Sequence, residues 1–235
     1  MTTYAIANSK GGVGKSTIAV QIACEKARQG RDVLVINGDR QKSSELAMLN
    51  RAQSDDFPPI TCVRYEHGPE LLAAHRVMKG KYDDIVIDVG GRDSSAMRAA
   101  LAVCDVALVP FAPGSFEVWA LEEMDELLRN ALSTRDPFPI YALLNLAEAK
   151  AQSADNADAL SALDEYPVYQ QLPFVMVRRK PFASAAGQGL SVHEVRPKNP
   201  KACHELDKLM QVLDGRPAYE VADSLDPVDG DTDAA

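Results

Sequence analysis

The sequence has no apolar run that approaches the roughly 20 residues needed for a membrane-spanning helix. It shows no basic, apolar and cleavable leader, because Met1–Thr3 leads directly into an apolar segment. Its four cysteines are scattered, without the C-x-x-C pairs typical of zinc or iron–sulfur sites. We therefore expect a cytoplasmic protein with no membrane partner, whose cysteines are small buried hydrophobes in a reducing compartment.

Positive charge is also scarce, but the deficit is uneven. The formal net charge is −9 at pH 7, and residues 214–235 hold seven acidic residues against one arginine, which leaves −3 for residues 1–213. The 214–235 segment contains Pro217, Pro227 and Gly230 and has no helical apolar stripe, so burial would not offset the entropy lost on ordering it. We predict one globular domain over 1–213 and a disordered acidic tail over 214–235.

Short apolar segments alternate with helical stretches through residues 1–213. Ser16–Gln29 is predicted to be a helix that Gly30 ends, and Phe116–Ser133 is predicted to be another. The predicted strands are Tyr4–Ala7, Val33–Asn37, Ile60–Tyr65, Ile85–Val89, Val106–Phe111 and Ile140–Leu146. Because these strands are apolar throughout, the pattern indicates an α/β fold with a single doubly wound, mostly parallel sheet and helices on both faces. Such folds bind ligands beyond the carboxyl ends of their strands.

A glycine-rich segment joins the first predicted strand to the first predicted helix. It fits the phosphate loop G-x-x-x-x-G-K-[ST] from Gly14 onward, with Ser9 in place of the first glycine, whereas a simple connecting turn is the alternative. In such a loop Lys15 would reach the β- and γ-phosphates, the Ser16 hydroxyl would complete Mg²⁺ coordination, and Thr17 would donate to the α-phosphate. The predicted ATP-binding residues of the loop are Lys10, Gly11, Gly12, Val13, Gly14, Lys15, Ser16 and Thr17.

The segment Ser9–Ser16 resembles the deviant Walker A signature of the ParA/MinD superfamily of ATPases, in its small ParA-like partition branch. The resemblance implies a P-loop ATPase that forms a nucleotide-sandwich homodimer in the ATP state. It also implies that Lys10 is the signature lysine. In that role Lys10 would cross the dimer, contact the partner's ATP phosphates and offset transition-state charge, so it is predicted to be catalytic together with Lys15.

Further segments extend the resemblance over nearly the whole chain before the tail. Asn37–Gln41 stands in the place of switch I, which implies that Asp39 orients the attacking water and binds Mg²⁺ through water; a solvated loop acid is the alternative. Asn37 and Arg40 replace an aspartate and a proline of the family pattern, so slow, partner-stimulated hydrolysis is expected. Asp88 ends an apolar strand in the Walker B arrangement and is predicted to hold Mg²⁺ through its water shell.

Three other residues are predicted to contact the nucleotide. The pattern D-x-x-G from Asp88 would present the Gly91 N–H to the γ-phosphate. Asn145 ends a predicted strand, and its amide has the donor and acceptor needed to read an adenine edge, although a turn cap is a competing interpretation. Pro173 lies where a loop of the family packs against adenine. His193 is interpreted as structural.

A basic stretch follows these motifs and, by resemblance, grips the DNA backbone without sequence preference. A solvated basic rim is the alternative. The predicted DNA-binding residues are Arg178, Arg179, Lys180, Arg196, Lys198 and Lys201, in a stretch that also contains Lys208.

Taken together, these features predict a ParA-like partition ATPase with ATP and Mg²⁺ as cofactors, associated with the nucleoid. With a cognate adaptor protein, it would segregate or position a plasmid, a chromosome region or a protein assembly. The acidic end of the chain argues against the basic membrane helix of MinD-type members. Two alternatives remain open: an ATP-dependent dimeric regulator of division or assembly, and a small-molecule enzyme like dethiobiotin synthetase or the cobyrinate amidases.

Overall fold

The computed structural model describes residues 1–114, 117–150 and 153–223. Its strands are β1 (Thr2–Ile6), β2 (Val33–Gly38), β3 (Thr61–Arg64), β4 (Asp84–Val89), β5 (Val106–Phe111), β6 (Ile140–Ala147), β7 (Gln170–Gln171) and β8 (Met176–Val177). Its helices are α1 (Lys15–Arg28), α2 (Ser43–Arg51), α3 (Gly68–Met78), α4 (Ser95–Val103), α5 (Glu117–Leu132), α6 (Ala154–Ser161), the 3₁₀ turn η1 (Ala162–Glu165), α7 (Lys180–Gly187), α8 (Pro200–Leu213) and α9 (Ala218–Asp223).

A single sheet of parallel strands organises the molecule. The strand order is β3-β2-β4-β1-β5-β6-β7, and β8 pairs with the end of β6. Every residue of β2 and β4 is buried, as expected for apolar strands covered on both sides. The predicted fold class is therefore confirmed.

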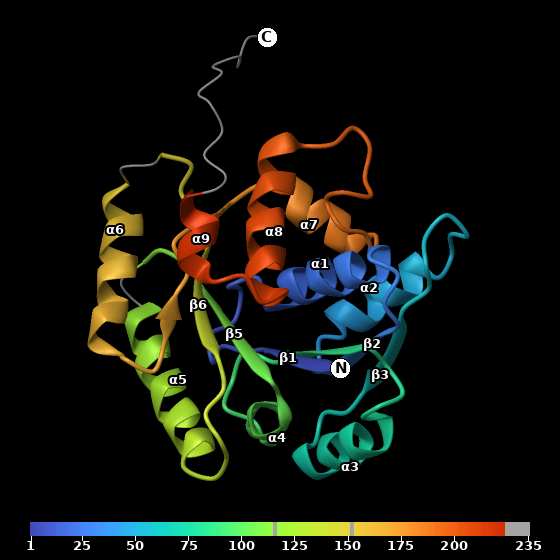
Figure 1. Cartoon of the computed structure of the whole chain (residues 1–235), viewed down its shortest axis with the longest axis horizontal. Coiled ribbons are helices and arrows are strands. Elements are labelled where there is room, and N and C mark those ends of the chain that lie inside the picture. Colours follow the sequence, from blue (N-terminus) through green and yellow to red (C-terminus); the bar gives the residue numbers. More distant parts are fainter. Residues whose placement is uncertain (115–116, 151–152, 224–235) are drawn as a thin grey trace.

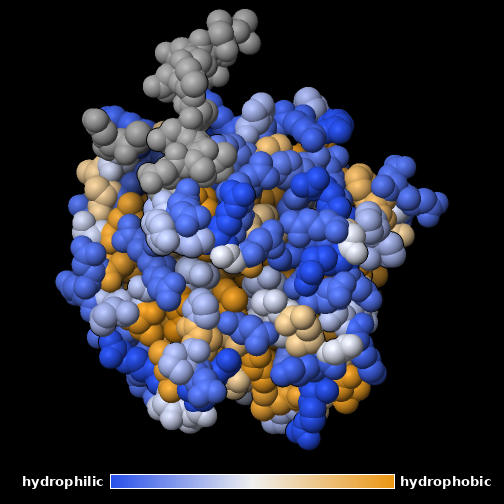
Figure 2. All heavy atoms as spheres, viewed as in Figure 1, coloured by the Kyte–Doolittle hydropathy of each residue, from blue (hydrophilic) through white to orange (hydrophobic). Residues whose placement is uncertain are grey.

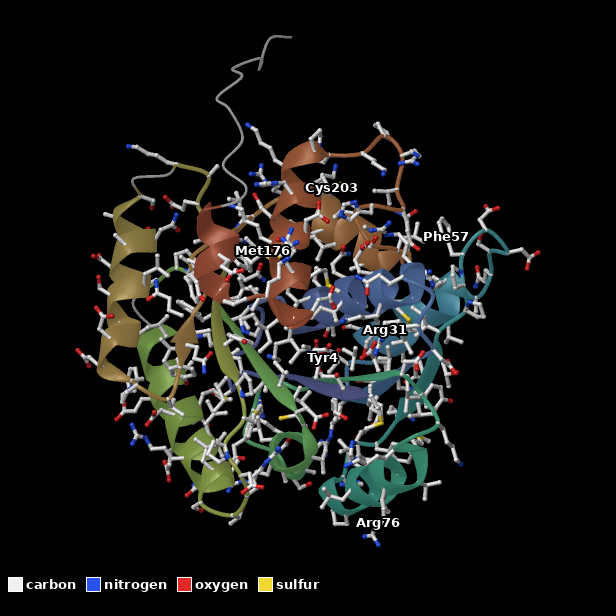
Figure 3. All side chains as sticks on the ribbon, viewed as in Figure 1. Tyr4, Arg31, Phe57, Arg76, Met176 and Cys203 are labelled. Carbon is white, nitrogen blue, oxygen red and sulfur yellow. The ribbon has the colours of Figure 1, made fainter. Side chains whose placement is uncertain are left out.

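Helices cover both faces of the sheet (Figure 1). Tyr4 and Ile6 of β1 face the core formed with α1, α7, α8 and α9, whereas Ala5 of β1 and Ala7, which follows the strand, face the core formed with α3, α4 and α5. In Figure 3 the labelled Tyr4 of β1 lies on the same side of the sheet as Met176 of β8 and Cys203 of α8, and all three belong to the first core. No helix of the described ranges is long and apolar enough to cross a membrane.

The register of the central strands sets the position of the site. Ile6 of β1 pairs with Asp88 of β4, and Asp88 pairs on its other side with Asn37 of β2. Residues paired in a parallel sheet place their side chains on the same face, so Asn37 and Asp88 are neighbours. The loops that follow β1, β2 and β4 therefore leave the sheet together at its carboxyl edge.

The structure continues beyond residue 213, into the segment expected to be an acidic tail. Asp214 forms an ion pair with Lys26, whose side chain is only 4% exposed, and α9 continues the fold to Asp223 with Val221 completely buried. Val221 is the only large aliphatic residue of α9, which is too little to show a helical apolar stripe in the sequence. It is nevertheless buried, because the end of α8 delivers it to the core around α1. Residues 224–235, the rest of the predicted tail, lie outside the described residues.

A buried ion pair ties α2 to the connection between α7 and α8. Arg51 is 1% exposed, and its Nη1 and Nη2 atoms each donate to Glu194 over 2.9 Å. Its Nη1 also donates to the carbonyl of Gly189 over 2.9 Å, and its Nε donates to the carbonyl of Pro58 over 2.7 Å. Breaking this pair would leave an uncompensated buried charge, which is costly in free energy. The pair therefore holds α2 against the connection between α7 and α8.

Candidate functional site

A buried asparagine, Asn8, fixes the path of the glycine-rich loop where it leaves β1. The Asn8 side chain donates to the Pro110 carbonyl over 2.8 Å and accepts from the Lys10 N–H over 2.8 Å. Gly12 and Gly14 then adopt φ angles of 82° and 89°, which side chains disfavour. No described side chain caps the amino end of α1, and its first turn contains no acid. The first N–H groups of α1 are thus available to an anion.

The two lysines of the loop have opposite environments. Lys15 is 6% exposed, and its Nζ donates to the Lys10 carbonyl over 2.7 Å, so it lies folded into the loop. The Lys10 side chain is exposed. The Lys15 charge is therefore held inside the loop, and the Lys10 charge faces solvent.

Asp88 is a fully buried carboxylate at the end of β4. Its pKa is raised to about 6: burial is the largest cause, the nearby Asp39 acts in the same direction, and the Ser16 and Ser44 hydroxyls and Lys15 offset part of the rise. Neither carboxylate oxygen forms a hydrogen bond of good geometry with a described residue. A buried acid with unused oxygens beside the Ser16 hydroxyl fits a hydrated Mg²⁺ completed by phosphate oxygens.

The segment after β2 bends around a second buried asparagine. The Asn37 side chain accepts from the Asp39 N–H over 2.8 Å, and Asp39 in turn accepts from the Gln41 N–H over 3.1 Å. A Cβ built on Gly90 would lie 3.3 Å from the Asp39 carboxylate, so Asp39 faces the loop that follows β4. Because Asn37 is neutral, it adds no charge beside the buried Asp88.

Gly91 packs directly on the phosphate loop. A Cβ at this position would lie 2.8 Å from Gly11 Cα and from Gly11 N, which leaves no room for a side chain. The backbone N–H of the segment after β4 can therefore come as close to a bound phosphate as the loop itself.

These segments enclose a cleft of about 970 Å³. The cleft is lined by most of the residues predicted to act on phosphate. Arg40, Glu66 and His67 also line it, and Glu66 and His67 were not predicted from the sequence. Val13 is buried beneath the loop, and Asp88 lies beneath the floor of the cleft. Within the described residues, no cluster of three His, Cys, Asp or Glu could hold a metal by itself. The predicted residues that line the cleft are Gly11, Gly12, Gly14, Lys15, Ser16, Thr17, Asp39 and Gly91.

A second, smaller pocket continues from the other side of the loop. Gly14 and Thr17 line both pockets, and the far wall of the second consists of Asn145, Leu146, Val177, Arg179, Phe182 and Ala183. The Asn145 amide donates to the Val13 carbonyl over 2.8 Å, and a Cβ on Gly14 would meet its nitrogen at 2.3 Å. Asn145 thus supports the loop while it lines the pocket.

Pro173 does not line this second pocket and is exposed, although the neighbouring Phe174 is buried. Val177 and Phe182 line it instead, and sequence reasoning missed both. Val177 could not be identified because it lies in β8, which contains only two residues, too few to show a periodic pattern.

Five of the six basic residues predicted to bind DNA are exposed, and they come from the β8–α7 connection, the start of α7, the α7–α8 connection and the first turn of α8. The surface over α8 and the α7–α8 connection is mainly hydrophilic (Figure 2). Arg179 differs from the other five, because it pairs with Glu205 of α8 and its side chain is only 21% exposed. The exposed residues are Arg178, Lys180, Arg196, Lys198 and Lys201.

Comparison with known proteins places this geometry among nucleotide-binding domains. A family model described as the CobQ/CobB/MinD/ParA nucleotide binding domain matches residues 4–192. The chain is 23% identical to the maintenance of carboxysome distribution protein A of Halothiobacillus neapolitanus over 209 residues, which cover 88% of this chain and 94% of the relative.

Two solved structures illustrate the shared fold. One is an ATP complex of a McdA variant from Cyanothece, with a TM-score of 0.73, 16% identity and coverage of 92% of this chain and 98% of that one. The other is the septum site-determining protein MinD from Pyrococcus horikoshii with Mg-ADP, with a TM-score of 0.66, 18% identity and coverage of 91% and 97%.

Proposed function

Because the chain belongs to the CobQ/CobB/MinD/ParA family of nucleotide-binding domains, we propose that it is a ParA-like positioning ATPase. In this proposal it binds ATP with Mg²⁺, closes into a homodimer, holds DNA without sequence preference and releases it after slow hydrolysis that an adaptor protein stimulates. Its cargo is a plasmid, a chromosome region or a protein assembly. The names of relatives, which include a carboxysome distribution protein and a ParA, support the positioning role.

The proposed chemistry follows from the residues around the cleft. The N–H groups of the loop and of α1 hold the phosphate chain, and Lys15 moves from the Lys10 carbonyl to the β- and γ-phosphates. Asp39 orients the attacking water beside the segment containing Gly90 and Gly91. Bound Mg²⁺ would neutralise phosphate charge, held by Ser16 and, through water, by Asp88 and Asp39.

The observation that carries the proposal is the exposure of Lys10 beside the buried Lys15. Lys15 already supplies one cationic group to the phosphates within a single chain. Lys10 is a second lysine in the same loop; its backbone N–H is held by Asn8 and its side chain is exposed, and in this proposal it enters the site of another copy. This arrangement supports an ATP-dependent dimer in which each chain completes the other's site.

The test compares three variants by ATP turnover and by analytical ultracentrifugation with Mg²⁺-ATP. Lys15→Ala should abolish nucleotide binding. Lys10→Ala should bind ATP but lose dimerisation and most turnover, whereas Asp39→Ala should bind ATP and accumulate as a dimer. A Lys10→Ala protein that dimerised and hydrolysed ATP like the wild type would refute the dimeric switch.

One observation favours a second candidate function, a small-molecule enzyme. Glu66 and His67 line the phosphate cleft and could serve as an acid and a base toward a co-substrate. However, Glu66 lies within 3.7 Å of Arg40 and Arg64 and is thus committed to ion pairs. ATP turnover that requires a small acid or amine and ignores DNA would favour this candidate.

A further inference from the structure

We propose that Arg179 is a nucleotide-positioning residue, which holds the base of the bound purine nucleotide, and that it is not part of the DNA-binding surface. The inference rests on the ATP binding in the proposed function and adds a residue to that site. It separates two adjacent arginines, Arg178 and Arg179, that the sequence alone gives the same role.

The position of Arg179 is the first support. Its side chain lines the small pocket that begins at Gly14 and Thr17 and that Asn145 and Phe182 also line. Because Gly14 and Thr17 also line the phosphate cleft, a nucleotide whose phosphates occupy that cleft would direct its base into or across this pocket. Arg178 lines neither pocket and is exposed.

The second support is that Arg179 is held in place. Its Nε donates to Glu205 Oε1 over 2.8 Å, and its Nη2 lies 2.7 Å from the same oxygen. The other carboxylate oxygen of Glu205 accepts from the Val177 N–H over 3.1 Å, which fixes the acid against β8. Met176, the residue before Val177, is buried in the core that Leu206 and Leu209 of α8 also enter, so β8 and α8 are packed together at this clamp.

The chemistry of the clamp suits a base better than a DNA phosphate. Burial raises the pKa of Glu205, and Arg179 opposes that rise, so the two charges largely satisfy each other. Because the negative charge of Glu205 offsets the positive charge of Arg179, the pair attracts a polyanion only weakly. The planar fork of Arg179 still has N–H groups at Nη1 for a ring nitrogen and a flat face for stacking on a purine.

Asn145 creates a need for such a donor. One of its two amide hydrogens is used on the Val13 carbonyl, which leaves its carbonyl oxygen and a single hydrogen to read one edge of an adenine. The ring nitrogens on the other edges of adenine are acceptors and require a donor from elsewhere. Arg179 is the cationic side chain on this wall among the residues that line the pocket.

The experiment measures the affinities of ATP, ADP and inorganic tripolyphosphate by competition against a fluorescent nucleotide, in three variants. Arg179→Lys keeps the charge and the ion pair but loses the fork. The double variant Arg179→Met with Glu205→Gln removes both buried charges together and keeps an acceptor for Val177. Arg178→Ala is the matched control, and thermal unfolding monitors the fold of each variant.

We expect both Arg179 variants to bind ATP and ADP about tenfold more weakly while tripolyphosphate, which has no base, binds as to the wild type. Arg178→Ala should leave all three affinities unchanged. Equal loss of ATP and tripolyphosphate, or unchanged nucleotide affinity with loss of DNA binding, would overturn the inference. A wild-type protein that bound neither ATP nor ADP would instead overturn the proposed function itself.

Discussion

Asp88 shows most directly how a single residue links stability to the site. Its carboxyl is completely buried, and its pKa is raised to about 6 from 3.8. The folded protein therefore binds this proton more tightly than the unfolded chain does. In the absence of a cation, protonation of Asp88 favours the folded state. The free energy of unfolding should therefore fall as the pH rises from about 4 to about 6.

This sign gives a prediction for Asp88→Asn. The amide removes the buried charge, so the ligand-free variant should be more stable than the wild type above pH 6, by up to about 3 kcal/mol, and should lose that advantage near pH 4. Urea unfolding without nucleotide or Mg²⁺, at several pH values, measures the difference. The variant should bind Mg²⁺ more weakly in the presence of ATP. A constant stability difference across this pH range would contradict the assignment.

At the scale of elements, α9 is the helix that could not be predicted from the sequence. Val221 of α9 is completely buried, and Asp214 at the end of α8 pairs with the nearly buried Lys26 of α1. The apolar contact is worth roughly 1.5–3 kcal/mol. Loss of Asp214 would also leave the charge of Lys26 without its partner.

We therefore expect two truncations to differ sharply. A chain ending at Leu213, the domain boundary expected from composition, should be destabilised by about 3 kcal/mol or more, because it loses both contacts. A chain ending at Asp223 keeps them and should unfold at the same urea concentration as the full chain. Chemical unfolding of the three proteins at one pH tests this, and equal midpoints for both truncations would show that α9 does not stabilise the core.

At the scale of the whole molecule, the proposed DNA grip depends on where the exposed basic side chains gather. Arg178, Lys180, Arg196, Lys198 and Lys201 are exposed on the segment that runs from the end of β8 to the first turn of α8, on a chain whose net charge is −9. The local concentration of positive charge, not the net charge, would determine contact with a polyanion.

The prediction is that Lys198→Glu with Lys201→Glu abolishes ATP-dependent DNA binding at low salt but leaves ATP affinity unchanged. The wild type should show a steep decrease of DNA affinity with salt, because each phosphate contact releases counterions. A mobility shift over a salt series, with and without ATP, measures both effects. Reversing the charge of the distant exposed Arg76 on α3 is the control, and it should leave DNA binding intact.

Much of the fold and of the phosphate site follows from local sequence. The strands around the site show as unbroken apolar runs, since both faces of β2 and β4 are covered, and the order of strand, glycine loop, Lys15 and helix is itself local. The positions of Asp88 and Asp39 near the carboxyl edge of the sheet could be predicted from the apolar strands that they end or follow, whereas the role proposed for Asp39 came from the family resemblance. The tertiary structure then brings Asp39 next to Gly90 and buries Asp88.

Only the tertiary structure decided what depends on contacts between distant segments. Arg178 and Arg179 are identical in type and adjacent in sequence, yet Glu205, 26 positions beyond Arg179, withdraws one of them from the surface and holds it at the second pocket. Arg51 and Glu194 form their buried pair across 143 positions. The sequence by itself determined the family of nucleotide-binding domains and the position of the glycine-rich loop between β1 and α1. The fold decided which charges remain available, because burial and pairing of a charge depend on what packs around it.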